Sequence, residues 1–82
     1  MKLAIKKIEQ HAEGRFYVTL WFDLNGEDVR TKLTKDHIQN LMQKGKIPPK
    51  LAVGMVLNVC ERAGKLGQKL YYVYGYESNK PL

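Results

Sequence analysis

Alternating apolar and polar side chains between residues 15 and 33 predict a two-stranded hairpin. Apolar side chains take every second position of its first half, at Phe16, Val18, Leu20, Phe22 and Leu24. The positions between them hold Arg15, Tyr17, Thr19, Trp21 and Asp23. Such alternation is typical of a half-buried strand, because successive side chains point to opposite faces. Asn25-Gly26 follows, and this pair favours a type I′ turn because both residues tolerate positive φ.

The two-residue turn sets the register of the hairpin. It puts Phe22 opposite Val29 on the apolar face, and Trp21 opposite Arg30 on the other face. The apolar faces therefore meet, and the second face combines aromatic rings with cations. We expect Arg30 to hold the Trp21 ring through a cation–π contact.

The segments on either side of the hairpin predict one more strand and one helix. A first strand runs from Lys2 to about His11, and the step from Ile5 to Ile8 breaks its alternation and indicates a bulge. Residues 34–44 predict a helix capped by Thr34, with Gly45 after its end. Its apolar stripe consists of Ile38, Leu41 and Met42.

Two further strands are predicted at 51–62 and 69–77. In the first, Val53 shares a face with Met55, Leu57 and Val59, and Val56 and Cys60 on the opposite face suggest cover from both sides. In the second, alternation puts Tyr72, Tyr74 and Tyr76 on one side.

The resulting order is β-β-β-α-β-β, so the fold class is mostly β with one helix. We expect residues 1–77 to form a single small five-stranded β-barrel, followed by a frayed tail at 78–82. An SH3-like barrel or an open α+β sheet fits this order nearly as well. The order of elements and the charge resemble those of small OB-fold proteins that bind single-stranded nucleic acid, including phage and plasmid proteins. The resemblance implies that the second and third strands form the binding face.

The positive charge balance of the chain fits a nucleic-acid ligand, an acidic protein partner or a simple role in solubility. Its 14 Lys and Arg residues outweigh 8 Asp and Glu residues, for a net charge of +6 and a pI near 9.6. No apolar run approaches the roughly 20 residues that span a bilayer, so we expect no membrane partner. The first seven residues are too short and too charged for a signal peptide, and we expect a cytoplasmic protein.

These patterns predict a surface that binds single-stranded DNA or RNA with little sequence preference, through base stacking and phosphate neutralisation. The candidate residues are Arg15, Tyr17, Trp21, Arg30 and Lys32 on the hairpin, Lys46, Lys65 and Lys69 around it, and Tyr72 and Tyr74 on the last strand. As an alternative, the same rings and cations suit a phage- or plasmid-type inhibitor that docks on an acidic host protein. A homodimer through the tyrosine strand is a third possibility.

Catalytic and metal-binding residues are sparse. Cys60 is the single cysteine, and His11 and His37 stand apart in the sequence. We therefore expect no enzyme, no metal and no cofactor. Asp23 and Asp28 should face each other across the hairpin, where flanking acids of a turn are usually solvated.

Overall fold

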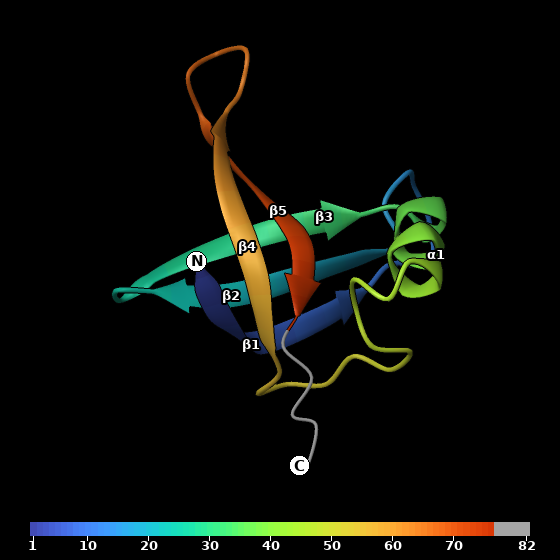
Figure 1. The fold of residues 1–82 in the computed structure, drawn as a ribbon. Coiled ribbons are helices and arrows are strands. Elements are labelled where there is room, and N and C mark those ends of the chain that lie inside the picture. The colour runs from blue at the N-terminus through green and yellow to red at the C-terminus, as the bar shows by residue number, and fades with distance from the viewer. Residues whose placement is uncertain (77–82) are drawn as a thin grey trace, which may run out of the picture.

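A curled, five-stranded antiparallel sheet with one helix at its end makes up the computed structural model, which describes residues 1–76 (Figure 1). The elements are β1 (Lys2–Gln10), β2 (Val18–Leu24), β3 (Glu27–Leu33), α1 (Lys35–Gln43), β4 (Val56–Ala63) and β5 (Lys69–Tyr76). They confirm the predicted order and the mostly β class. The strands lie in the order β3-β2-β1-β4-β5, so β3 and β5 are the two edges of a half-barrel. Glu77 and the predicted tail at 78–82 lie outside the described residues.

β1 belongs to both halves of the curled sheet. Lys2 to Ala4 pair with β4, whereas Ile5 and the residues after Lys6 pair with β2. The register shifts between Ile5 and Lys7, which confirms the predicted bulge. The β4–β5 hairpin can therefore cross in front of β1, β2 and β3, and its tip extends past β3 (Figure 1).

The β2–β3 hairpin has the predicted register. Phe22 pairs with Val29 and Trp21 pairs with Arg30. Asn25 and Gly26 form the turn with φ of 53° and 87°, a conformation that an Asn-Gly pair adopts at low cost.

The core lies inside the curl, where it is closed at one end by α1. Its fully buried side chains are Ile5, Leu20, Phe22, Leu33, Ile47, Leu57 and Val59. The N-cap hydroxyl of Thr34 accepts a hydrogen bond from the His37 amide at 3.1 Å. Gly45, with φ of 69°, ends the helix in a Schellman motif, since the Lys46 amide donates to the Leu41 carbonyl at 2.8 Å. Ile38 and Leu41 are buried, as the predicted stripe requires.

Two predicted strand starts are wrong. β2 begins at Val18 rather than Arg15, because a turn at Gly14 (φ 95°) leads into a loop that leaves Phe16 exposed. β4 begins at Val56 rather than residue 51, because Gly54 (φ 95°) makes a turn that leaves Val53 exposed. Val56 is also exposed, so β4 is not covered on both sides.

The prediction that three tyrosines share one face of β5 is wrong as well. Asn58 pairs with Gly75 but Val59 pairs with Val73, so Tyr74 is an extra residue in a bulge. A bulge reverses the inward and outward alternation beyond it. Tyr76 therefore packs against the core, whereas Tyr72 and Tyr74 are exposed.

Candidate functional site

The outer face of β2 and β3, together with the loop before β2, gathers aromatic rings and cations. We call this surface the ring–cation face and define it by Arg15, Phe16, Trp21, Arg30 and Lys32. The cation–π contacts found among residues 1–76 all lie here, and they involve the rings of Phe16 and Trp21. The face is thus organised by the attraction between positive charge and the negative face of an aromatic ring.

The Trp21 indole is half-buried and held from two sides. Its Nε1 donates a hydrogen bond to the carboxylate of Glu9 on β1. The Arg30 guanidinium carbon lies 5.3 Å from the ring centroid, which confirms the predicted cation–π contact. The ring orientation is therefore fixed before any ligand arrives.

The alternation puts Phe16 on the apolar face of the hairpin, but in the structure its side chain is exposed on the surface. Lys32 Nζ lies 5.6 Å from its ring centroid and the Arg15 guanidinium carbon lies 5.7 Å from it. One sequence signal argues against a buried position for this ring. Phe16 comes only two residues after Gly14, a residue that favours a turn. Glu9 was also missed, although its place beside the inward-facing Ile8 indicated the outer face.

A shallow hollow of about 290 Å³ opens beside Trp21. It is lined by Glu9, His11, Glu13, Gly14, Arg15, Phe16, Thr19, Trp21, Arg30 and Lys32. Thr19 is buried, and its Oγ1 lies 2.8 Å from His11 Nε2, which ties the loop to the sheet. Three cations and two carboxylates line the hollow, so its charge is only weakly positive.

A larger groove of about 580 Å³ lies between the free edges of β3 and β5, and we call it the seam groove. Its lining consists of Phe16, Arg30, Thr31, Lys32, Gln68, Lys69, Leu70, Tyr71 and Tyr72. This lining includes three cations and no carboxylate. Phe16, Arg30 and Lys32 line both the hollow and the groove, so the two are continuous.

The other predicted residues divide into those near this surface and those away from it. Lys69 and Tyr72 line the seam groove. Tyr17 is exposed but lines a separate hollow beside Ile38 and Met42 of α1. The prediction that Tyr17 shares the face of Trp21 is therefore wrong. The remaining three, Lys46, Lys65 and Tyr74, are exposed and line neither the hollow nor the groove.

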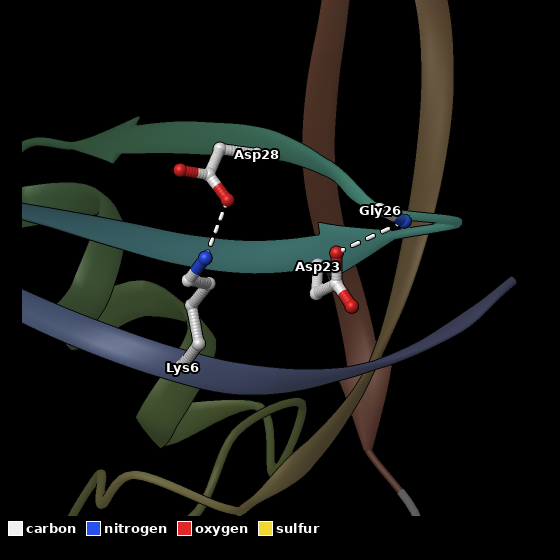
Figure 2. Close-up of polar contacts among 4 residues, drawn as sticks. All are labelled: Lys6, Asp23, Gly26 and Asp28. Atoms are coloured by element: carbon white, nitrogen blue, oxygen red, sulfur yellow. Dashed lines mark hydrogen bonds and ion pairs between the residues drawn. The ribbon is translucent and has the colours of Figure 1, made fainter.

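Asp23 and Asp28 do face each other, and a lysine lies against them. Lys6, at the β1 bulge, reaches across β2 to pair with the Asp28 carboxylate (Figure 2). The hydrogen bond to Asp28 raises the pKa of Lys6 above its usual 10.5, an effect opposed by desolvation and strengthened by the charges of Asp28 and Asp23. Asp23 also accepts a hydrogen bond from the Gly26 amide at 3.1 Å. The acidic pair is therefore part of the hairpin end and not an open metal site.

Residues 1–76 contain no cluster of three or more His, Cys, Asp or Glu side chains suited to a metal ion. Cys60 lies on β4 opposite Tyr72, whereas His37 lies in the first turn of α1. Within the same residues, no helix is long and apolar enough to cross a membrane.

No protein-family model, curated protein or solved structure matches this chain. The geometry of the ring–cation face and the chemistry of its residues are therefore the basis for assigning a function.

Proposed function

We propose that the protein binds single-stranded nucleic acid with little sequence preference, using the ring–cation face. Trp21 and Phe16 stack on bases, and Arg15, Arg30 and Lys32 neutralise phosphates. Stacking on aromatic side chains contributes roughly 1–3 kcal/mol per base and tolerates any sequence, because every base has a π-face. Cations that replace condensed counterions make such binding strongly dependent on salt.

One observation supports this proposal above the others. Two partly exposed rings, Trp21 and Phe16, each lie 5.3–5.7 Å from at least one cation on the same surface. A base that stacks on either ring brings its phosphate within reach of a positive charge. Rings without neighbouring cations would suit an apolar partner, and cations without rings would suit a duplex backbone.

We also propose that the half-barrel is of the OB type. The helix between the third and fourth strands and the approach of the two sheet edges support this assignment. OB-folds bind oligonucleotides on the face of strands 2 and 3 and on the loops between strands 1–2 and 4–5. The corresponding parts here are the β2–β3 face, residues 13–16 of the first loop and Gln68 of the second, which line the hollow or the seam groove.

The test is a titration of the purified protein with fluorescein-labelled oligo(dT) and with a duplex of equal length, each at two salt concentrations. We expect tighter binding of the single strand, quenching of Trp21 emission, and a steep loss of affinity with salt. Trp21→Ala should weaken binding about 5-fold or more, and Trp21→Phe should retain part of the affinity.

Tyr17→Ala provides the matched control, because it removes an exposed ring that lines a different hollow. Its affinity for oligo(dT) should stay within about 2-fold of the original protein. Equally weak binding of the single strand and the duplex would show that charge alone drives the interaction, which would contradict the proposal. Capture of an acidic protein that survives nuclease treatment, without any oligo(dT) binding, would favour a protein-docking module instead.

A further inference from the structure

The seam groove lies between two strands that do not pair with each other. Among the described residues, β3 pairs only with β2 and β5 pairs only with β4. The groove volume of about 580 Å³ is within the range of roughly 300–1,000 Å³ that is usual for small-ligand pockets. It is the larger of the two spaces that adjoin Arg30 and Lys32.

The lining of the groove combines flat apolar groups with positive charge. Tyr72 is 40% exposed and Phe16 is 36% exposed, so both rings are accessible to a ligand. Arg30, Lys32 and Lys69 supply the cations, and no carboxylate lies among the lining residues. The hollow at Trp21 is lined by two carboxylates, those of Glu9 and Glu13, which repel an anionic ligand. Such a ligand therefore gains more electrostatic binding energy from the seam groove than from the hollow alone.

The width of the seam favours a planar base over an inserted peptide strand. Some Cα atoms of β3 and β5 lie within 8 Å of each other. Two strands with a third strand between them would be about 9.6 Å apart, twice the usual spacing of neighbouring strands. A flat ring needs no such separation, because it stacks on the side chains at the mouth of the groove.

We propose that the seam groove is a second base-binding subsite, and that one single strand crosses β3 from Trp21 to Tyr72. This inference depends on the proposed function and defines the course of the ligand on that surface. Phe16, Arg30 and Lys32 line both the hollow and the seam groove, so they connect the two subsites. The strand therefore runs across the β2–β3 hairpin and not along it.

The test compares two tyrosines on the same strand of the folded full-length protein. Tyr72 lines the groove, whereas Tyr74, which is 50% exposed, does not. We expect Tyr72→Ala to weaken binding of oligo(dT) of about 16 nucleotides by about 5- to 150-fold, the effect of one lost stacked base. Tyr74→Ala should change the affinity less than about 2-fold, and thermal unfolding checks that both variants fold.

Two lysines give an independent measurement that does not alter a ring. Lys69, the first residue of β5, lines the groove, whereas Lys65, in the loop between β4 and β5, does not. Lys69→Ala should reduce the slope of log affinity against log salt by about 0.7, the value for one phosphate contact on a single strand. Lys65→Ala should leave the slope unchanged.

The outcomes separate this inference from the proposed function. If the original protein binds oligo(dT) and Trp21→Ala weakens binding, but Tyr72→Ala and Lys69→Ala match their controls, the second subsite is wrong and the proposed function stands. If the original protein does not bind oligo(dT) at all, both are wrong.

Discussion

Glu9 accepts a hydrogen bond from the indole Nε1 of Trp21, so a carboxylate lies beside the principal ring of the ring–cation face. The same carboxylate lies 3.9 Å from Lys7 Nζ. Glu9 thus fixes the indole orientation, and its negative charge opposes the approach of a phosphate. These two effects can be separated by a substitution that keeps the acceptor and removes the charge.

We predict that Glu9→Gln increases the affinity for single-stranded nucleic acid by about 1.4- to 5-fold. This is the usual size of one exposed charge interaction, roughly 0.2–1 kcal/mol. Anisotropy titration with labelled oligo(dT) measures the change. Glu27→Gln removes an equal charge at the far end of the hairpin and should have a smaller effect. A lower affinity of Glu9→Gln would mean that the charge of Glu9 aids binding.

The salt dependence should identify which cations meet phosphates. Arg30→Ala and Lys32→Ala should each reduce the slope of log affinity against log salt by about 0.7. Lys46→Ala removes a cation that lines neither the hollow nor the seam groove, and its slope should equal that of the original protein. Equal slopes for all three variants would show that binding depends on net charge and not on this face.

Lys6 should contribute to stability in a pH-dependent way. Its folded pKa is raised by Asp28, so its contribution is complete below the unfolded value of 10.5 and is lost as the pH rises through the folded pKa. Thermal unfolding of Lys6→Gln and of the original protein should therefore differ most near neutral pH and converge at strongly alkaline pH.

Lys7→Gln is the control for that measurement, because Lys7 is also exposed and its Nζ lies 3.9 Å from the carboxylate of Glu9 rather than against Asp28. Its unfolding should show no comparable convergence. A constant difference between Lys6→Gln and the original protein across the alkaline range would contradict the role of the Lys6–Asp28 pair.

The stability of the protein should be sensitive to any side chain introduced at Gly26, in the turn of the β2–β3 hairpin. Gly26 has φ of 87°, and nothing lies within 4 Å of the position that a Cβ would take. Gly26→Ala should therefore destabilise the fold by backbone strain alone, by about 1–2 kcal/mol. Asn25→Gly, at the neighbouring φ of 53°, should change stability by less, and urea unfolding compares the two. No loss for Gly26→Ala would mean that the turn can adopt another type.

Local sequence patterns were sufficient to predict the structure wherever neighbouring residues alone determine the backbone conformation. The Asn25-Gly26 pair predicted the turn, and the turn fixed the register that puts Trp21 opposite Arg30. Thr34 and Gly45 predicted the two ends of α1. These features depend on φ preferences and short hydrogen bonds, which the sequence specifies directly.

Alternation failed where a turn or bulge interrupted it. Phe16 continued the apolar pattern, yet the loop after Gly14 turns its ring toward Lys32 and Arg15. The Tyr74 bulge moved Tyr76 to the core face, because one extra residue reverses the side on which every later side chain lies.

The sequence by itself determined the order of the elements, the hairpin and its register, and the presence of rings and cations on one face. The tertiary structure alone decided that Glu9 holds Trp21, that Lys6 lies against the acidic pair, and that the edges of β3 and β5 form a groove. The physical reason is the curl of the sheet, which brings together strands that are distant in sequence. No periodicity within a single strand contains that information.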